Sequence, residues 1–272
     1  MFTKRLTSYS DYQSMDLELD NKTIVVTGGN KGIGKSISEI LTGENANVAI
    51  CALDESSGKS LENILRHHGK NAKFYKTDVS SEVDVKGAVD SITNDFGEIY
   101  GLVNNAGISM PMKNLHDIEL DEWNHVINVN LNGTFLMTKH IIPKLMKHNS
   151  GSIVNISSIA ALVEGSNKPP VPYGASKGAI LSFSRAAAMK YADKGIRINT
   201  VCPGPVYSEQ LERRASENSD KNVYLEKLAS SIPLGRIGQP EDIARLVAFL
   251  LSPISSFITG TQVVIDGGFT SR

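Results

Sequence analysis

Short runs of apolar residues alternate along this chain with longer segments of helical period, and this alternation constrains the fold most strongly. The runs are continuously apolar rather than alternating with polar residues; they are Thr23–Thr27, Asn47–Ala52, Ala72–Lys76, Tyr100–Asn104, Ser152–Ile156, Ile198–Val201 and Gln262–Ile265. Strands of this kind are buried on both faces, as in parallel sheets that helices cover on both sides. The sequence therefore predicts an α/β fold with a parallel sheet and right-handed crossovers.

The segments between these runs have the period of helices. They are Gly34–Leu41, Ser57–His67, Val83–Phe96, Leu120–Val129, Gly133–Lys147, Tyr173–Tyr191 and Ile243–Leu251. No linker, charge block or low-complexity stretch interrupts the alternation, so we expect one dinucleotide-binding and catalytic domain over residues 20–272. Residues 1–19 are polar and lack a hydrophobic signal core. We expect them to form an N-terminal tail outside the fold, or alternatively to dock on a partner subunit.

Composition narrows the classes of function. The 272 residues carry a net charge of −1, so no overall field draws the protein to nucleic acid or to an anionic membrane. No apolar stretch reaches the roughly 20 residues that cross a bilayer. Cys51 and Cys202 lie inside apolar strands, where buried free thiols are expected rather than a disulfide. This usage favours a reducing, cytoplasmic compartment. The six histidines lie in polar helical or loop contexts without ligand spacing, so no metal site is expected.

A glycine-rich turn follows the first strand and opens into a helix. Its glycines, Gly28, Gly32 and Gly34, suit a tight turn whose backbone must approach a ligand closely. The helix after the turn directs its free N–H groups and the positive end of its dipole at the same place. The spacing is G-x-x-x-G-x-G rather than the commoner G-x-G-x-x-G. The arrangement predicts an anion site suited to a pyrophosphate, although an ordinary strand–helix turn is the alternative interpretation.

Further motifs follow in an order that resembles the short-chain dehydrogenase/reductase family. After the glycine turn come Asp78-Val79, Asn104-Asn105-Ala106-Gly107, Asn130, Ser158, Tyr173-x-x-x-Lys177, Pro203-Gly204 and Asp266-Gly267-Gly268. The resemblance covers the chain from about Lys22 to its end. It implies a single Rossmann-type, doubly wound domain with a seven-stranded parallel sheet. The implied activity is hydride transfer between a nicotinamide dinucleotide and a ketone or secondary alcohol.

The resemblance also assigns the cofactor contacts. They are Gly28, Asn30, Lys31, Gly32, Ile33, Gly34, Asp78, Val79, Asn105, Ala106, Gly107, Tyr173, Lys177, Pro203, Gly204, Val206 and Ser208. Asp78 would bind the adenine amino group, and Pro203-Gly204 would cover the nicotinamide. Ser208 stands where the family usually has a threonine that binds the carboxamide. A hydroxyl is kept there, but the methyl group is lost.

Tyr173 and Lys177 are four residues apart on a predicted helix, so their side chains share one face. A fixed ammonium lowers the pKa of a nearby tyrosine, which can then exchange a proton with a carbonyl or alcohol oxygen. The resemblance implies that Ser158 polarises the substrate oxygen, that Lys177 binds the nicotinamide ribose, and that Asn130 holds a relay water. Ser157 competes with Ser158 at the end of the fifth strand. Strand alternation directs the two hydroxyls to opposite sides, and the family pattern favours Ser158.

Substrate residues are expected above the carboxyl ends of the strands. The candidates are mostly apolar and include no arginine clamp for a carboxylate; they are Ser109, Met110, Leu162, Val163 and Tyr207. We therefore expect a small, largely apolar carbonyl or alcohol substrate. The loop Ile159–Pro172 contains clustered prolines and is either a surface insertion or a shaped pocket wall. The segment Glu209–Leu228 resembles the family's substrate lid, and the family implies a homo-oligomer, a tetramer or dimer.

Cofactor preference depends on the end of the second strand. Enzymes that select NAD usually have a carboxylate there, and this chain has Ala52, with Asp54 two residues further on. Lys31 lies in the glycine turn, where an ammonium could pair with the 2′-phosphate of NADP. NADP is therefore favoured over NAD, unless Asp54 reaches back to the ribose.

Two functions of other kinds are the alternatives. One is an enoyl-thioester reductase of the same fold, in which the tyrosine and lysine would be further apart than they are here. The other is a catalytically silent nucleotide-binding regulator. A regulator would be expected to lack part of the set Asn130, Ser158, Tyr173 and Lys177, which is complete in this sequence.

Overall fold

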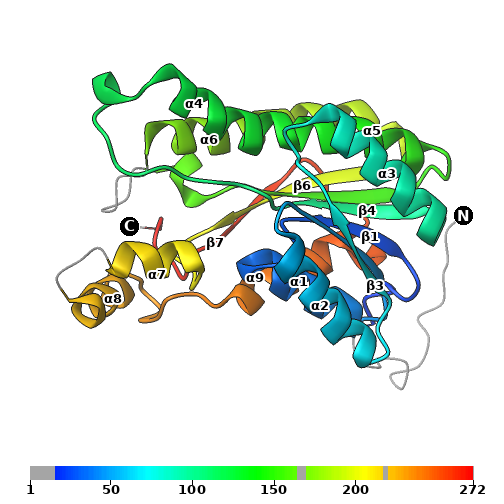
Figure 1. The fold of residues 1–272 in the computed structure, drawn as a ribbon, viewed down its shortest axis with the longest axis horizontal. Coiled ribbons are helices and arrows are strands. Elements are labelled where there is room, and N and C mark those ends of the chain that lie inside the picture. Colours follow the sequence, from blue (N-terminus) through cyan, green and yellow to red (C-terminus); the bar gives the residue numbers. More distant parts are fainter. Residues whose placement is uncertain (1–15, 164–169, 217–219, 272) are drawn as a thin grey trace, which may run out of the picture.

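A parallel sheet lies between two layers of helices in the computed structural model, which describes residues 16–163, 170–216 and 220–271 (Figure 1). The strands are β1 (Thr23–Thr27), β2 (Asn47–Ala52), β3 (Ala72–Lys76), β4 (Ile99–Asn104), β5 (Gly151–Ile156), β6 (Ile196–Pro203) and β7 (Gln262–Ile265). Their spatial order is β3-β2-β1-β4-β5-β6-β7. The chain order reverses between β1 and β4, where open α/β sheets bind ligands at the carboxyl ends of their strands.

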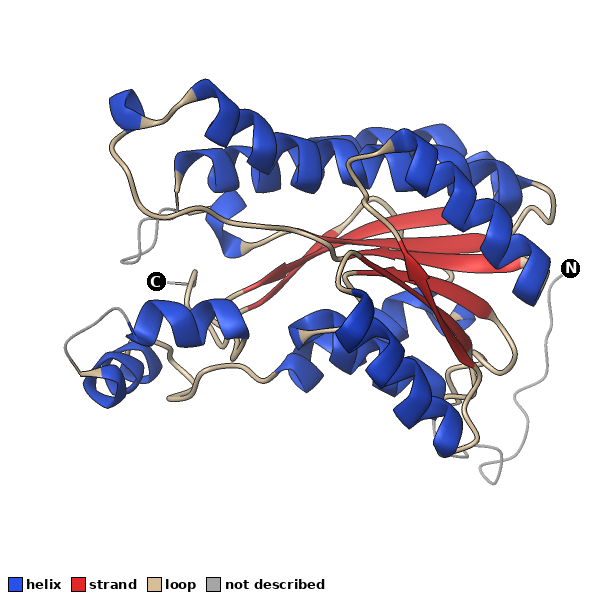
Figure 2. Ribbon diagram, viewed as in Figure 1, coloured by secondary structure: helices blue, strands red, loops and turns tan. Residues whose placement is uncertain are grey.

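Helices cover both faces of this sheet (Figure 2). One layer contains α1 (Gly32–Gly43), α2 (Glu55–His67) and α9 (Pro240–Leu251). The other contains α3 (Glu82–Phe96), α4 (Leu120–Ile127), α5 (Gly133–Met146) and α6 (Val171–Tyr191). Two short helices, α7 (Glu209–Ser216) and α8 (Lys221–Ser230), lie beyond the carboxyl end of β6. The doubly wound Rossmann-type fold expected from the sequence is thereby confirmed.

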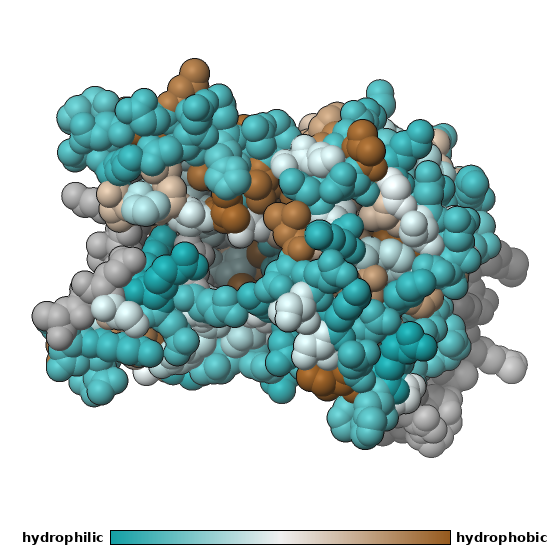
Figure 3. All heavy atoms as spheres, in the orientation of Figure 1, coloured by the Kyte–Doolittle hydropathy of each residue, from teal (hydrophilic) through white to brown (hydrophobic). Residues whose placement is uncertain are grey.

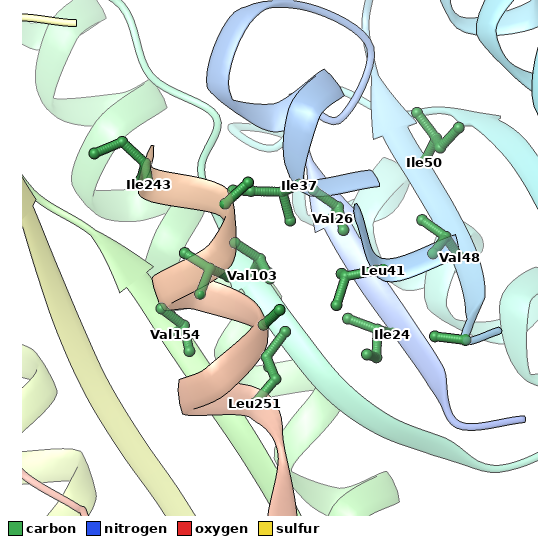
Figure 4. Packing of buried hydrophobic residues seen from close by; sticks show 14 of the residues in the cluster. Ile24, Val26, Ile37, Leu41, Val48, Ile50, Val103, Val154, Ile243 and Leu251 are labelled. Atoms are coloured by element: carbon green, nitrogen blue, oxygen red, sulfur yellow. The ribbon is translucent and has the colours of Figure 1, made fainter. Parts of the chain in front are cut away.

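Successive residues of each strand contribute to two separate cores, which explains the continuously apolar runs. Ile24 and Val26 of β1 pack toward α1 and α9, and Figure 4 shows them with other residues of this cluster, among them Leu41 and Leu251. Val25 lies between them in sequence and packs on the opposite side, among residues of α3 and α5. All three β1 side chains are fully buried. Each buried aliphatic side chain stabilises the fold by roughly 1.5–3 kcal/mol, so the sheet is held from both faces.

The predicted strands match the structure more closely than the predicted helices do. β1, β2, β3 and β7 have the predicted bounds, and the other strands and most helices begin one to three residues earlier than predicted. One helical prediction needs correction, and the segment 209–228, expected to resemble a substrate lid, contains helix α7 and most of helix α8. The predicted helix Leu120–Val129 ends at Ile127 and continues into a π-helical turn, Asn128–Asn132.

The boundary predicted for the N-terminal tail is too late in the sequence. Leu19 is only 1% exposed and belongs to the core that α1 and α9 form. The carbonyl of Leu17 accepts a hydrogen bond from the Ser252 hydroxyl at the end of α9. Residues 17–19 are thus part of the domain. The rest of the predicted tail, residues 1–15, lies outside the described residues.

The expectations about the two cysteines and about membrane-spanning helices can be checked in the described residues. Cys51 and Cys202 are both buried and free, as predicted. Within residues 16–163, 170–216 and 220–271, no helix has the length and apolar character that crossing a bilayer requires.

Candidate active site

The glycine turn between β1 and α1 has the geometry of a cradle. Gly28 has a φ of +60° and Gly32 a φ of +51°, in the left-handed region that favours glycine. A Cβ on Gly34 would lie 2.0 Å from the Gly28 carbonyl oxygen, so only glycine fits there. A Cβ on Gly32 would meet nothing within 4 Å, so this position borders open space. No side chain caps the N-terminus of α1. The turn therefore fits a pyrophosphate, whose oxygens would accept from its free N–H groups.

Thr27 and Asn105 tie this turn to the end of β4. The Thr27 hydroxyl accepts from the backbone N–H groups of Asn105 and Ala106, at 2.9 and 3.0 Å. The Asn105 amide donates to the carbonyls of Thr27 and Gly28, at 3.0 and 3.2 Å. Asn105, predicted as a cofactor contact, thus holds the glycine turn against the neighbouring strand. This connection fixes the switch point of the sheet.

Lys31 and Asp54 form an ion pair at the outer edge of the turn. The Lys31 ammonium lies 2.8 Å from the Asp54 carboxylate, and both side chains are nearly half exposed. A hydrogen bond from Lys31 holds the pKa of Asp54 at about 2. Asp54 also caps α2 by accepting from the Ser57 N–H. Asn30 donates to the Ser57 hydroxyl at 2.7 Å. Lys31 and Asp54, which the sequence analysis linked to cofactor preference, are therefore direct neighbours.

Asp78 and Val79 follow β3 at the next position along the same edge. One oxygen of Asp78 accepts from the N–H and hydroxyl of Ser80, at 2.9 and 2.7 Å. Val79 is buried, and a Cβ on Gly133 would lie 2.7 Å from its methyl group. Val79 therefore packs against the start of α5, while Asp78 stays partly exposed beside it. Ile33, the remaining predicted contact of the glycine turn, is partly buried against the α1–α9 core.

Tyr173 and Lys177 lie on successive turns of α6, which begins at Val171. The Lys177 ammonium is 5.7 Å from the centre of the Tyr173 ring and donates to the Ile156 carbonyl at 2.8 Å. Lys177 is only 4% exposed, and burial lowers its pKa to about 8. Burial raises the pKa of Tyr173, while a hydrogen bond with Ser158 and the charge of Arg214 act in the opposite direction.

The two serines after β5 point to different partners. The Ser157 hydroxyl is buried and donates to the Lys177 carbonyl at 2.8 Å. Ser158 is partly exposed and forms its hydrogen bond with the Tyr173 phenol. Its hydroxyl also accepts from the Ala160 N–H. Ser158 is thus the serine of the pair that stands beside the phenol.

Asn130 lies in the π-helical turn between α4 and α5 and is completely buried. Its side-chain oxygen accepts from the Ile108 N–H at 2.8 Å, and its amide donates to the Ile108 carbonyl and the Ser176 hydroxyl, at 2.9 and 3.0 Å. Ser176 in turn donates to the Tyr173 carbonyl. Sequence reasoning missed Ser176, because a serine inside a helix gives no local signal of this connection.

Gly107 brings these residues to the end of β4. A Cβ there would lie 3.3 Å from the Asn130 side-chain oxygen and 3.4 Å from the Lys177 ammonium. The end of β4, the π-helical turn and α6 therefore meet at one place. The structure brings together all four residues that the sequence nominated for catalysis: Asn130, Ser158, Tyr173 and Lys177.

Pro203 and Gly204 end β6 next to the closing motif of the chain. A Cβ on Gly204 would lie 2.6 Å from the Asp266 side chain, which explains the need for glycine. Val206 is buried and forms an isolated bridge with Gly238. The Ser208 hydroxyl accepts from the Leu211 N–H at the start of α7. Ser208 thus stabilises the start of α7 through its hydroxyl oxygen. The hydrogen of the same hydroxyl can be donated to another group.

The candidate substrate residues are spread around this centre. Ser109 and Met110 are partly buried in the loop after β4, and Leu162 and Val163 follow the 3-10 turn after Ser158. Tyr207 packs with the small hydrophobic cluster of α7 and α8 and lines a cavity of about 320 Å³ beside α8. The face of the molecule drawn in Figure 3 has a hollow, and hydrophobic residues gather above it in that view.

One charged residue near this centre was not foreseen. Arg214 of α7 is partly buried and donates to the Ser109 hydroxyl at 3.4 Å. The sequence showed no arginine among the loops that follow the strands, because Arg214 lies on helix α7 and not in the loop directly after β6. The prolines of the loop before Tyr173 lie partly outside the described residues. Pro170 and Pro172 form the first turn of α6, a position that suits proline.

Comparison with known proteins agrees with this arrangement. A family model described as enoyl-(acyl carrier protein) reductase matches residues 28–270. The 2-(S)-hydroxypropyl-CoM dehydrogenase 3 of Xanthobacter autotrophicus is 37% identical over 94% of this chain and 100% of its own length. The cyclohexanol dehydrogenase of an Acinetobacter species is 36% identical over 95% and 98% of the two chains. Glucose 1-dehydrogenase 2 of Bacillus subtilis is 35% identical over 93% and 96%.

Solved structures of similar proteins have the same fold. The crystal structure named "a putative short-chain dehydrogenase/reductase from Burkholderia xenovorans" superposes with a TM-score of 0.88. It is 29% identical and covers 93% of this chain and 98% of its own. A short-chain type dehydrogenase/reductase from Mycobacterium marinum also superposes with a TM-score of 0.88, at 29% identity over 94% and 98% of the two chains.

Proposed function

The chain belongs to the short-chain dehydrogenase/reductase family and is an oxidoreductase, and from this premise we propose an NAD(P)-dependent dehydrogenase with Tyr173 as its general acid and base. Its substrate would be a ketone or secondary alcohol. The relatives that are named as cyclohexanol and glucose dehydrogenases act on alcohols, by their names. The observation that carries the proposal is the meeting of Tyr173, Ser158 and Lys177 beside the glycine turn.

Each residue would have a separate part in moving the proton. When bound, the nicotinamide dinucleotide supplies or accepts the hydride. The Tyr173 phenol gives its proton to the carbonyl oxygen in reduction, or takes it from the alcohol in oxidation. The Ser158 hydroxyl, already hydrogen-bonded to the phenol, binds the same oxygen and polarises it. The Lys177 ammonium favours the phenolate, because an opposite charge nearby stabilises it.

Asn130 would contribute to the proton path with its backbone carbonyl. Its side chain already forms hydrogen bonds with Ile108 and Ser176. A relay water would therefore bind at the Asn130 carbonyl, which here accepts from the Thr134 hydroxyl and has a second lone pair. Lys177 would pass its proton to that water and so to solvent.

NADP remains the proposed cofactor. β2 ends at Ala52, so no carboxylate occupies the place where one would repel a 2′-phosphate. Asp54 competes for the Lys31 ammonium, but ion pairs with both partners this exposed are weak. A doubly charged phosphate would outcompete one exposed carboxylate for that ammonium. Lys31 would then change partners when NADP binds.

Two broader expectations accompany this proposal. Exposed apolar side chains on the long helices and the last strand, such as Phe135, Met189 and Val264, support a homo-oligomer, a tetramer or dimer. The two buried free thiols fit a reducing, cytoplasmic compartment.

Reduction of an enoyl thioester is the second candidate, because the matching family model is described by that activity. Tyr173 and Lys177 stand one helical turn apart, which argues for the carbonyl reaction. The test is a screen of ketones, secondary alcohols and enoyl thioesters, with NADPH and NADH absorbance as the readout. We expect turnover of ketones or alcohols. Turnover of enoyl thioesters alone would replace the proposal, and cofactor binding without any turnover would indicate a regulator.

A further inference from the structure

Ser176 lies on α6 between Tyr173 and Lys177, and its side chain is fully buried. The Ser176 hydroxyl accepts a hydrogen bond from the Asn130 amide at 3.0 Å and donates to the Tyr173 carbonyl at 2.8 Å. It therefore joins two elements of the proposed site. One is the π-helical turn that carries Asn130, and the other is the start of α6, which carries the tyrosine and the lysine.

The direction of each hydrogen bond in this network is fixed by its partners. The Ile108 N–H can only donate, so the Asn130 atom that it meets at 2.8 Å is the side-chain oxygen. The Asn130 nitrogen must then donate, and it does so to the Ile108 carbonyl and to Ser176. The Ser176 oxygen thus accepts, and the hydroxyl hydrogen is left for the Tyr173 carbonyl. Both functions of the hydroxyl are used, and an alanine would remove both.

The side chain that Ser176 holds borders the proposed proton path. A Cβ on Gly107 would lie 3.3 Å from the Asn130 side-chain oxygen and 3.4 Å from the Lys177 ammonium, so both groups border the same glycine. The backbone carbonyl of Asn130 is the proposed site of the relay water. Ser176 and Ile108 hold the Asn130 side chain from two directions. They thereby fix where this carbonyl lies relative to the ammonium.

A second serine of α6 has the same local geometry, but its hydrogen-bond partners lie outside the proposed catalytic set. Ser184 is also buried, and its hydroxyl accepts from the Asn155 amide at 2.8 Å and donates to the Ile180 carbonyl at 2.6 Å. Asn155 belongs to β5 and accepts from Asn104 of β4, so this pair fastens α6 to the sheet. Ser184 lies about two helical turns beyond Ser176 and provides a matched comparison for it.

We propose that Ser176 is a positioning residue, which holds the Asn130 carbonyl and the Tyr173–Lys177 face of α6 at the spacing that proton transfer requires. The inference rests on the proposed dehydrogenase function and adds a residue to it. Ser176 touches neither substrate nor cofactor in this account, because its side chain is fully enclosed. It acts through the two groups that its hydroxyl joins. A misplacement of about 1 Å in such a site can lower a rate by about 10²-fold.

The rival explanation is that Ser176 only satisfies buried polar groups, as Ser184 does. Both explanations predict a lower Tm for Ser176→Ala, because the Asn130 amide loses an acceptor. They differ in what they predict for the chemistry. A structural serine changes the stability alone. A positioning serine also changes kcat and its dependence on D2O, because slower proton transfer then limits the rate.

The experiment compares the wild type, Ser176→Ala and the matched control Ser184→Ala on the best ketone or alcohol, in H2O and in D2O. We expect Ser176→Ala to lower kcat at least about tenfold, with KM within about threefold, and to raise the ratio of kcat in H2O to kcat in D2O. Ser184→Ala should lower the Tm but keep the wild-type kcat and isotope ratio. An unchanged isotope ratio in Ser176→Ala, or the same changes in Ser184→Ala, would overturn the inference.

Two further variants keep the test decisive if Ser176→Ala is too unstable to assay. Ser176→Thr retains the hydroxyl, and a threonine in a helix can donate to the carbonyl three residues earlier, as Ser176 does. Its additional methyl group should lower the Tm in this closely packed place. Ser176→Cys fills nearly the same space but offers only a weak donor and acceptor. We expect kcat of Ser176→Thr to exceed that of Ser176→Cys at least about fivefold. Equal kcat values would contradict the proposal.

A double variant tests the route through Asn130. Asn130→Ala keeps the backbone carbonyl and removes the side chain that Ser176 holds. In this background Ser176→Ala should lower kcat by less than about threefold, because residues that act through one another are not additive. The same loss in both backgrounds would overturn the inference and leave the dehydrogenase function intact. A wild type that turns over neither ketones nor alcohols would instead overturn the dehydrogenase function, and this inference with it.

Discussion

Lys177 is a cation that folding removes from water. It is almost completely buried, and no carboxylate among the described residues forms an ion pair with it. Its ammonium donates to the Ile156 carbonyl, which compensates only part of its lost hydration. Burial accordingly lowers its pKa to about 8. The buried ammonium of Lys177 therefore lowers the stability of the fold at the position where the proposed chemistry needs a positive charge.

This conflict predicts that Lys177→Met raises the thermal stability of the cofactor-free protein at pH 7 and abolishes turnover. The methionine removes the buried charge and keeps much of the side-chain volume. The stability of the wild type should rise as the pH increases from about 8 to about 10.5, because the unfolded chain then binds more protons than the folded one. The gain in Tm should be largest below pH 8 and shrink above it. A variant less stable than the wild type at pH 7 would contradict this explanation.

A second residue-scale prediction concerns the pair Lys31 and Asp54. Asp54→Asn removes the charge that competes for Lys31 but keeps the cap of α2, since asparagine caps as well as aspartate. We expect the ratio of kcat/KM for NADPH over NADH to rise several-fold in Asp54→Asn and to fall about tenfold in Lys31→Ala. Both ratios are measured on one substrate. A wild type that prefers NADH would identify Asp54 as the ribose ligand instead.

At the scale of elements, the turn between β1 and α1 allows a sharp test. Gly32→Ala adds a methyl group in open space, at a cost of roughly 1 kcal/mol for the left-handed backbone. We expect a folded protein whose affinity for the dinucleotide falls at least about tenfold, since the methyl group would fill the cradle. Gly43→Ala, at the other end of the same helix and also without neighbours within 4 Å, is the control. Equal dinucleotide affinity in both variants would remove the cradle from the cofactor site.

The same elements show what sequence can and cannot predict. Buried strands such as β1 and β2 were predicted with their bounds, because continuous apolar runs flanked by turns have few alternatives. The π-helical turn around Asn130 was not predicted, because it depends on hydrogen bonds to Ile108 and Ser176 from other elements. The burial of Leu19 also escaped prediction, since one apolar residue in a polar segment has no period.

The candidate site shows the same division. Motifs with fixed spacing, such as the glycine turn and Tyr173-x-x-x-Lys177, were visible in the sequence because one local element carries each of them. The approach of Arg214 to Ser109 joins residues 105 positions apart. The pairing of Lys31 with Asp54 depends on the relative placement of α1 and α2. Contacts between residues of different elements form only in the assembled fold, and no local sequence pattern predicts them.

At the scale of the whole molecule, the N-terminal segment closes the core at the end of α9. We expect a chain that begins at Asp16 to keep the specific activity within about twofold and to keep its Tm, because it retains Leu17 and Leu19, which pack on the domain. A chain that begins at Asp20 loses Leu19 and the Leu17–Ser252 hydrogen bond. Its Tm should fall by several degrees, as a loss of about 2–5 kcal/mol implies. Equal Tm values for the two truncations would contradict the place of Leu19 in the core.

The central claim is that the Tyr173 phenol moves the proton during hydride transfer. Tyr173→Phe removes only the phenolic oxygen, so the fold and the cradle at the β1–α1 turn should persist. The decisive measurement is kcat of this variant on the best substrate, together with dinucleotide affinity by fluorescence titration. We predict a loss of at least about 10²-fold in kcat with dinucleotide affinity unchanged. A kcat near that of the wild type would contradict the account and remove Tyr173 from the mechanism.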